Sequence, residues 1–360
     1  MNFAYDYRLI DSEYCDVRFI GMNTADGFRW CLDGLPKERD LKRTYIIKGA
    51  AGTGKSTLMK TVADRFESGG NRVVRFLCSS DPDSLDAVLI GDGILILDGT
   101  APHVKDALYP GALSELVCLG NFWNKDKLIC RSSEIVDLSE KKACCFRKAY
   151  RFMSGMRQLS LDIFEDAEST LDVPKIKNVI SRIVGRMKRN DGVPVYSETI
   201  IRSFGMKGTV KLTTLDNRAK SVTTVSDTYG TGRVFMSLLS EELKKAGISF
   251  VCSPDPLFAS QISDIFVPGE GLLFSVDRTD KTDKFINMER FVLKEKLGTK
   301  RGEIRLAYKC WDALRRDAET ELCEAAGYHF ELERIYGAAM NFDAVTAYRK
   351  LLIRDIENRL

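Results

Sequence analysis

The feature that most constrains the fold is a glycine-rich segment at residues 46–60, IIKGAAGTGKSTLMK. An apolar strand pattern at residues 45–47 leads into it. After it, apolar residues recur at the spacing of a helix until Gly69 and Gly70, at Leu58, Met59, Val62, Ala63 and Phe66. A strand, a glycine loop and a helix in this order predict an α/β fold with a ligand-binding loop at the edge of its sheet.

The loop matches the pattern G-x-x-x-x-G-K-[ST]. Glycines let the backbone curl with its N–H groups turned inward, and the following helix adds the positive end of its dipole, so a polyphosphate meets many donors at once. Lys55 is expected to reach the β- and γ-phosphates and to take part in catalysis, and the Ser56 hydroxyl is expected to bind Mg²⁺. The alternative is a glycine turn with a purely structural role. The predicted ATP-binding residues are Gly49, Ala50, Ala51, Gly52, Thr53, Gly54, Lys55, Ser56 and Thr57.

A second anchor for Mg²⁺ is predicted at Asp98. It ends the unbroken apolar run of residues 94–97, and such runs are typical of strands covered on both faces. A carboxylate at the carboxyl end of such a strand lies at the edge where open α/β sheets bind ligands. Asp98 is therefore assigned to the metal, through water, and to catalysis. The alternative is that it only opens a turn with Gly99.

The sequence leaves the catalytic base open. Residues 72–78 form another strand pattern, and Asp81 follows it at the same expected edge. We predict that Asp81 orients a water or a substrate hydroxyl, although Asp-Pro is also an ordinary turn opener. Many ATPases carry Glu directly after the metal-binding Asp, whereas this chain has Gly99. Thr100 and His103 are further candidates for the base, unless hydrolysis is slow and binding or phosphoryl transfer is the main task.

The second half of the chain repeats motifs of the first in the same order. Gly-Thr-Gly recurs at residues 230–232, CSPDP at 252–256 repeats CSSDP, and a second apolar run ends at Asp277 as the first ends at Asp98. The sequence therefore predicts a tandem duplication of one unit. Glycine and proline near residues 189–194 predict the boundary, with a first domain at 1–189 and a second at 190–360.

The second loop lacks the residue types that phosphate chemistry needs. In the repeat alignment Arg233, Val234 and Asp227 stand where the first loop has its lysine, its hydroxyl and its first glycine. Valine cannot coordinate a metal, and a carboxylate beside the loop repels phosphate. We therefore predict a degenerate second loop with a structural or regulatory role. The alternative is that Arg233 or Arg278 reaches the first site and acts as an arginine finger.

Long helical patterns follow each predicted sheet, at about residues 139–166 and 303–326. Apolar stripes of this kind are typical of buried helix faces. We expect these helices to form a cap over each sheet, as a lid or as a surface for a partner.

The composition disfavours several other classes of protein. Lys and Arg (54) nearly balance Asp and Glu (51), and a net charge of +3 gives no field that would recruit nucleic acid. The ten cysteines include no Cys-x-x-Cys pair and there are two histidines, so no zinc cluster is predicted. No apolar run approaches the length of a membrane span, and the first residues lack the pattern of a signal peptide. We expect a cytoplasmic protein without membrane association.

The motifs KGAAGTGKSTLMK, CSSDPDSLD and ILILDGTAPH and the weakened second copy resemble a family of two-lobed P-loop ATP-binding proteins of Gram-positive, often spore-forming bacteria. Members are described as ATPases or nucleotide-kinase-like proteins, and the likeness covers nearly the whole chain. It implies ATP binding at residues 49–57 and two tandem P-loop lobes, each a mostly parallel sheet flanked by helices. In that family the second lobe often carries a complete P-loop, and this sequence departs there.

Three functions stay open at this point. The first is a Mg²⁺-dependent ATPase whose second lobe is regulatory or structural. The second is a kinase that transfers the γ-phosphate to a nucleotide or small-molecule acceptor near Asp81 and the helical cap. The third is a non-catalytic, ATP-dependent switch that binds a protein partner. GTP is disfavoured because the guanine-reading Asn-Lys-x-Asp is absent, and NKDK at residues 124–127 has Lys127 where Asp is needed.

Overall fold

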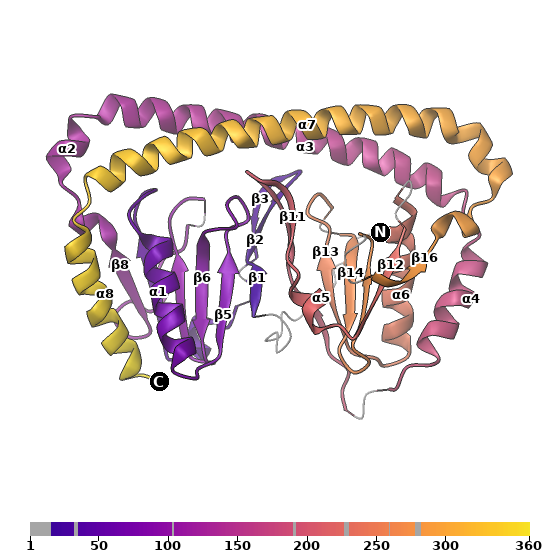
Figure 1. Cartoon of the computed structure of the whole chain (residues 1–360), viewed down its shortest axis with the longest axis horizontal. Coiled ribbons are helices and arrows are strands. Elements are labelled where there is room, and N and C mark those ends of the chain that lie inside the picture. Colours follow the sequence, from indigo (N-terminus) through magenta and orange to yellow (C-terminus); the bar gives the residue numbers. More distant parts are fainter. Residues whose placement is uncertain are drawn as a thin grey trace.

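The computed structural model describes residues 16–31, 35–102, 104–189, 192–226, 230–258, 260–277 and 282–360. Within these residues two six-stranded sheets stand side by side, with helices flanking each and a pair of long helices spanning both (Figure 1). The chain is α/β and its sheets are mostly parallel, which confirms this part of the sequence prediction.

The first half of the chain builds a sheet with the strand order β1-β5-β6-β7-β4-β8. In it β6 runs antiparallel to both neighbours, and the other neighbouring pairs are parallel. The elements in chain order are β1 (Val17–Phe19), β2 (Gly21–Thr24), β3 (Gly27–Trp30), η2 (Glu38–Asp40), β4 (Arg43–Lys48), α1 (Lys55–Ser68), β5 (Val73–Leu77), β6 (Leu85–Ile90), β7 (Ile94–Asp98), β8 (Ser114–Cys118), η3 (Leu119–Phe122), α2 (Lys125–Ile129), α3 (Ser132–Glu168) and α4 (Val173–Val184).

The second half repeats this topology, because its strand order is β9-β13-β14-β15-β12-β16 when followed from the matching edge. Here β14 is the strand that runs antiparallel to both neighbours. Each half also carries a hairpin, β2–β3 or β10–β11. The elements are β9 (Tyr196–Glu198), β10 (Arg202–Gly205), β11 (Gly208–Lys211), α5 (Thr214–Arg218), β12 (Ser221–Val225), α6 (Thr231–Lys245), β13 (Phe250–Pro254), β14 (Ile262–Val267), β15 (Leu272–Ser275), β16 (Thr282–Ile286), η5 (Met288–Phe291), α7 (Lys294–Ala338) and α8 (Phe342–Glu357).

The strand register shows which residues of the two halves are equivalent. Arg43 pairs with Ile94 in the first sheet, and Ser221 pairs with Leu272 in the second. Both pairs follow the same turn, in which the amides of Arg43 and Ser221 donate to the carbonyl of the glycine that precedes the partner strand. These two pairs therefore occupy the same place in each sheet.

Counting along the strands from these pairs corrects the sequence alignment. Asp98 lies four residues beyond Ile94, and its counterpart four residues beyond Leu272 is Val276 rather than Asp277. The alignment is one residue off because both strands end with an Asp close to the sheet edge, and composition alone cannot show the register. The second sheet thus has a buried valine where the first has its carboxylate.

The helices that follow the two loops are also offset from the sequence alignment. Buried positions match in order: Leu58, Met59, Val62, Ala63 and Phe66 in α1, and Phe235, Met236, Leu239, Ser240 and Leu243 in α6. This match puts Gly232 at the level of Lys55 and Arg233 at the level of Ser56. The prediction that Arg233 replaces the lysine is wrong by one residue, because the second loop is one residue shorter than the first.

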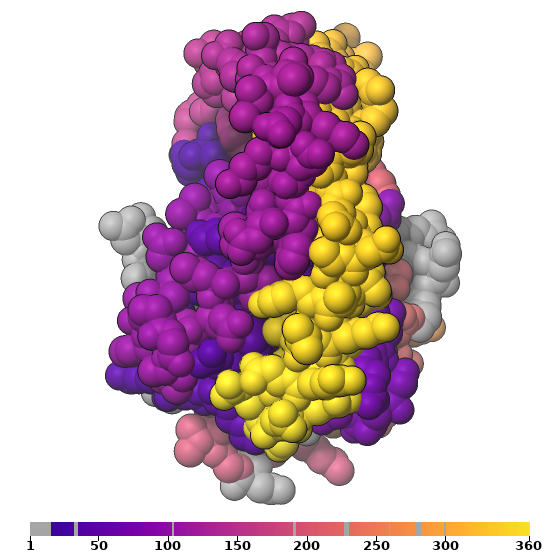
Figure 2. Space-filling model, turned by 90° about the vertical axis from the view of Figure 1, so that its left-hand side faces the viewer, coloured from indigo at the N-terminus to yellow at the C-terminus, as the bar shows by residue number. Residues whose placement is uncertain are grey.

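The two expected helical stretches exist as parts of α3 and α7, but they span both sheets, and the helices that pack on each half, α4 and α8, follow the sheet of the other half. From the first half, α3 crosses to the second, where Ile176 and Ile180 of α4 share a buried cluster with α6. From the second half, α7 returns to the first, where Leu352 and Ile356 of α8 pack with α1 and the first sheet (Figure 1). Figure 2 shows α8 lying over the first half of the chain. A domain boundary near residue 190 stays a prediction.

The two long helices, α3 and α7, run antiparallel along each other across both sheets (Figure 1). Their interface is apolar at its centre and rests on Phe204 of β10, with Ala149, Met153, Met156, Ala318 and Leu322 buried in one cluster. Toward solvent, Lys148 Nζ lies 2.9 Å from Glu321 Oε1. The pair therefore joins the two halves through buried apolar contacts. None of the described helices combines the length and the apolarity that a membrane crossing requires.

The β10–β11 hairpin also packs directly on the loop that follows β5. The Met206 amide donates to Ser80 O at 2.9 Å, and Asn23 Nδ2 donates to Phe204 O at 2.8 Å. A Cβ added to Gly205 would overlap Ser79 O and would lie 2.8 Å from Ser80 O. The backbones of the two halves thus approach as closely as glycine allows.

We predict that Gly205→Ala lowers the free energy of unfolding by about 1–3 kcal/mol, since the methyl group meets backbone atoms that cannot rotate away. Chemical denaturation followed by circular dichroism measures the change. Gly192→Ala is the matched control, because an added Cβ there meets nothing within 4 Å. Equal stability of the two variants would contradict the close approach.

Candidate functional site

The glycine loop lies between β4 and α1, where the sequence predicts it. Gly52 and Gly54 adopt left-handed φ values of +70° and +86°, a region that favours glycine, and Gly54 is the N-cap of α1. Thr53 Oγ1 donates to Ala50 O at 2.8 Å and closes the turn. The loop is therefore a tight curl ahead of a helix N-terminus.

Lys55 folds back over this loop. Its Nζ donates to the carbonyls of Gly49 and Ala50, both at 2.8 Å, and lies 3.6 Å from Asp98 Oδ2. Its side chain is largely buried, as is that of Asp98. The ammonium thus lies between the loop and the carboxylate, the two groups that the sequence assigned to the same site.

Asp98 is held at the end of β7 by its neighbours. Ile47 pairs with it across the parallel β4–β7 ladder, and its Oδ1 accepts from the Thr100 amide at 2.8 Å. Burial raises the pKa of Asp98, while the charge of Lys55 and the bonds from Thr100 oppose the rise. The Thr100 hydroxyl donates to Gly49 O at 3.0 Å. The end of β7 therefore contacts the glycine loop in two ways: Thr100 bonds Gly49 directly, and Asp98 pairs with Lys55, which bonds the loop carbonyls.

Ser56 also lies where a metal ligand is expected, at the first turn of α1. Its Oγ accepts from the Leu85 amide at 3.1 Å, which fixes the hydroxyl against the start of β6. Serine hydroxyl and aspartate carboxylate oxygens are ligand types that Mg²⁺ takes. Ser56 and Asp98 carry oxygen atoms of the types that fit such an ion.

Asp86, in β6, is a site residue that the sequence analysis missed. It is buried on the strand next to β7, and burial, together with the charge of Asp98, raises its pKa to about 8. The thiol of Cys78 lies beside it, and burial raises the pKa of that thiol well above its usual value. Asp86 therefore keeps its proton near neutral pH. The available signal was a single acid inside the apolar run LDAVLI.

Asp81 makes local bonds in the turn after β5. Its Oδ1 accepts from the Asp83 amide at 3.3 Å, and its Oδ2 accepts from the Ser84 hydroxyl at 2.8 Å. Its charge adds slightly to the raised pKa of Asp86. This geometry is that of a turn-forming Asp near the site, and its catalytic role stays a prediction. His103 lies outside the described residues.

The two long helices cover the glycine loop. Ala51 packs against a cluster formed by Leu138 of α3 and by Leu332 and Ile335 of α7. A Cβ on Gly52 would overlap Glu333 O and would lie 2.7 Å from Glu333 Cα. Glycine is thus required at position 52 for two reasons: its φ is left-handed, and the backbone of α7 leaves no room for a side chain.

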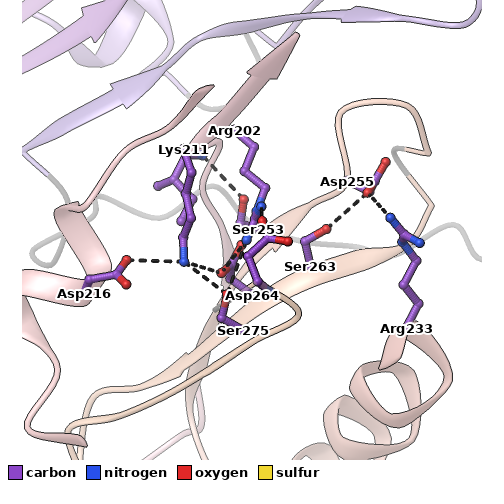
Figure 3. A network of polar contacts seen from close by, with 11 residues as sticks. Arg202, Lys211, Asp216, Arg233, Ser253, Asp255, Ser263, Asp264 and Ser275 are labelled. Atoms are coloured by element: carbon purple, nitrogen blue, oxygen red, sulfur yellow. Dashed lines mark hydrogen bonds and ion pairs between the residues drawn. The ribbon is translucent and has the colours of Figure 1, made fainter. Parts of the chain in front are cut away.

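In the corresponding region of the second half Arg233 forms an ion pair, shown in Figure 3. Arg233 Nη2 lies 2.8 Å from Asp255 Oδ2, and that oxygen also accepts from Ser263 at 3.3 Å. Burial would raise the pKa of Asp255, but Arg233 and two backbone amides outweigh burial and lower it. A cavity of about 210 Å³ lies beside Arg233, bounded by Phe258 and Trp311 among others.

This arrangement bears on the proposed arginine finger. Helices α1 and α6 lie on opposite sides of the molecule, so Arg233 belongs to its own half and does not face Lys55 (Figure 1). Arg278 and Asp227 lie outside the described residues. Arg233 is thus paired within the second half.

A second polar network lies on the other face of the second sheet, also in Figure 3. Arg202 Nε lies 2.6 Å from Asp264 Oδ2, and Lys211 Nζ lies 3.2 Å from Asp264 Oδ1 and 3.4 Å from Asp216. Asp277 also pairs with Arg202. In the first sheet the position of Asp264 is occupied by an alanine, as the matching β6–β7 and β14–β15 ladders show. The network is therefore a feature of the second half alone.

The structure places Lys55 3.6 Å from Asp98, puts Ser56 beside Lys55 in the first turn of α1, and adds the buried Asp86 on the strand next to Asp98, while the binding and catalytic roles of these residues stay predictions. Comparisons of the chain with models of protein families, with curated proteins and with solved structures found no match.

Proposed function

We propose that the first half of the chain binds ATP with Mg²⁺ at residues 49–57 and hydrolyses it, and that the second half has a regulatory or structural role. The observation that carries this proposal is that Lys55 lies 3.6 Å from Asp98 beside a glycine loop at a helix N-terminus, with Ser56 next to it in the first turn of α1. Amides, one ammonium group and two oxygen ligands are the set that a metal-bound triphosphate needs. The resemblance of the motifs to two-lobed ATP-binding proteins supports the same proposal.

Each residue has a distinct task in it. The loop amides and Lys55 bind phosphate oxygens, and Lys55 keeps its place by its bonds to Gly49 and Ala50. Ser56 and Asp98 would hold Mg²⁺, which supplies charge neutralisation between the phosphates. Asp86 stores a proton beside Asp98, and the buried strands around it exclude water.

A second candidate is a non-catalytic switch in which ATP binding changes the contact with a protein partner. The observation that favours it is the packing of α7 on Gly52, which links the loop to a helix that begins in the second half. Gly99, where many ATPases have Glu, agrees with slow hydrolysis.

Three measurements on the full chain separate the functions. Phosphate released from ATP and Mg²⁺ alone supports the ATPase. ADP formed only after a nucleotide or small-molecule acceptor is added supports a kinase. Saturable binding with neither reaction supports the switch. Absence of ATP binding in calorimetry would contradict all three.

A further inference from the structure

Phe342, the first residue of α8, carries an aromatic ring beside the glycine loop, and the proposed function does not use it. Its Cε1 atom lies 3.6 Å from the place that a Cβ on Gly54 would take, and Gly54 is the N-cap of α1. The side chain is 48% exposed. Single exposed apolar residues are common on protein surfaces, so what distinguishes Phe342 is its position at the loop. The ring thus lies within reach of a molecule bound there.

The junction between α7 and α8 holds Phe342 in this place. The Asn341 amide donates to Phe122 O at 3.0 Å, which ties the start of α8 to η3, the short helix after β8. Asn341 Oδ1 accepts from the Ala344 amide at 3.1 Å and caps α8. Because the backbone beside the ring is already fixed, contact with a ligand costs little ordering entropy.

Residues 124–127, NKDK, also hold this junction. The Asn124 amide donates to Ala339 O at 2.8 Å, and Lys127 Nζ donates to Ala338 O at 3.5 Å. Asn124 Oδ1 accepts from the Lys127 amide at 3.2 Å and caps α2. These polar groups therefore bind the chain itself and help to fix the start of α8.

The order of the strands shows which end of a bound nucleotide lies toward Phe342. The loop follows β4, which lies between β7 and β8. Asp98 ends β7 on one side, while α8 packs on the other side, where Leu352 shares a buried cluster with Val117 of β8 (Figure 1). Because Mg²⁺ bridges the β- and γ-phosphates, the terminal phosphates belong on the side of Asp98. The nucleoside end then extends toward β8 and Phe342.

We propose that Phe342 stacks on the base of the bound nucleotide, so that the site takes a nucleoside triphosphate in preference to a bare polyphosphate. This inference rests on the proposed function, since it assumes that the loop binds the phosphates. Every base has a flat aromatic face, so stacking adds affinity for the nucleotide and leaves the choice between bases to other contacts. The stacked base also removes the apolar surface of the ring from water.

The test is calorimetry on the full chain with ATP and Mg²⁺, repeated with inorganic tripolyphosphate and Mg²⁺. Phe342→Ala should weaken binding of ATP about fivefold to a hundredfold, the range that stacking of a base on an aromatic side chain contributes. Its affinity for tripolyphosphate should equal that of wild type, because this ligand has no base, and this result also shows that the loop is intact. Phe342→Tyr should retain most of the affinity for ATP, since it keeps an aromatic ring.

The matched control is Phe285→Ala, which should leave both affinities unchanged. Phe285 is a phenylalanine of similar exposure, 58%, in β16 of the second half. If Phe342→Ala binds ATP like wild type while Lys55→Met loses it, this inference is wrong and the proposed site stands. Equal weakening of both ligands by Phe342→Ala would also overturn it, because the ring would then act on the loop and not on a base. If wild type binds neither ligand, the proposed function itself is wrong.

Discussion

Replacing Lys55 by Met should abolish most of the thermal stabilisation that ATP and Mg²⁺ give to the wild-type chain. At a ligand concentration of a hundred times the dissociation constant, binding stabilises the folded state by about 2.7 kcal/mol. For a chain of 360 residues, with an unfolding entropy of about 2.1 cal/mol/K per residue, that corresponds to a rise of roughly 3–4 °C in melting temperature. Loss of the Lys55 charge removes about 1.5–3 kcal/mol of charge-assisted bonding to phosphate. This loss is comparable with the whole stabilisation of about 2.7 kcal/mol that the ligand gives. Turnover should fall at least about a hundredfold.

Differential scanning fluorimetry with and without ATP measures this shift for each variant against its own ligand-free value. That reference is needed because Lys55 also lies 3.6 Å from the largely buried Asp98, so its loss changes the ligand-free stability as well. Lys60→Met, at an exposed position of the same helix, is the control and should keep the full shift. A full shift in Lys55→Met would show that the triphosphate binds elsewhere.

Replacing Arg202 by Met should lower the free energy of unfolding by about 3–5 kcal/mol, the usual cost of removing one partner of a buried ion pair. Asp264 is fully buried, and Arg202 holds both of its oxygens, at 2.6 and 3.0 Å. Without the guanidinium, Lys211 is the remaining cation within ion-pair distance of this carboxylate among the described residues. Urea denaturation followed by fluorescence measures the loss.

The control is the double variant Arg202→Met, Asp264→Ala, which copies the alanine that the first sheet has at this position. It should be more stable than Arg202→Met alone, because no buried charge is left unpaired. A double variant no more stable than the single one would show that packing by the arginine stem, rather than its charge, stabilises the fold.

The same network predicts the response of the protein to acid. Burial would raise the pKa of Asp264, but the charges of Arg202 and Lys211 outweigh burial and lower it to about 2. The unfolded value is about 3.9, so the ionised carboxylate stabilises the fold above that pH and loses this effect as the pH falls toward 2. We expect the unfolding free energy of wild type to drop in this range, and to drop less in the double variant.

Much of the candidate site follows from short-range sequence patterns. The order of strand, glycine loop and helix depends on residues within about twenty positions of one another, and α1 and β7 end where the glycines and Asp98 predict. The class of fold and the mostly parallel sheets follow from the same patterns. The sequence did not predict Asp86 as a site residue, because an acid inside an apolar run can face either side of a strand. Only the antiparallel insertion of β6 beside β7 places it next to Asp98.

By itself, the sequence determined the loop, the lysine and hydroxyl that follow it, and the carboxylate at the neighbouring strand end, because local backbone geometry and hydrophobic periodicity act over a few residues. Only the tertiary structure decided the register between the halves, the exchange of α4 and α8, and the packing of α7 against Gly52. Periodicity shows that one face of a helix is buried, but a long helix can bury that face against either sheet. Which sheet it covers depends on how α3 and α7 pack together, and that packing involves residues far apart in the chain.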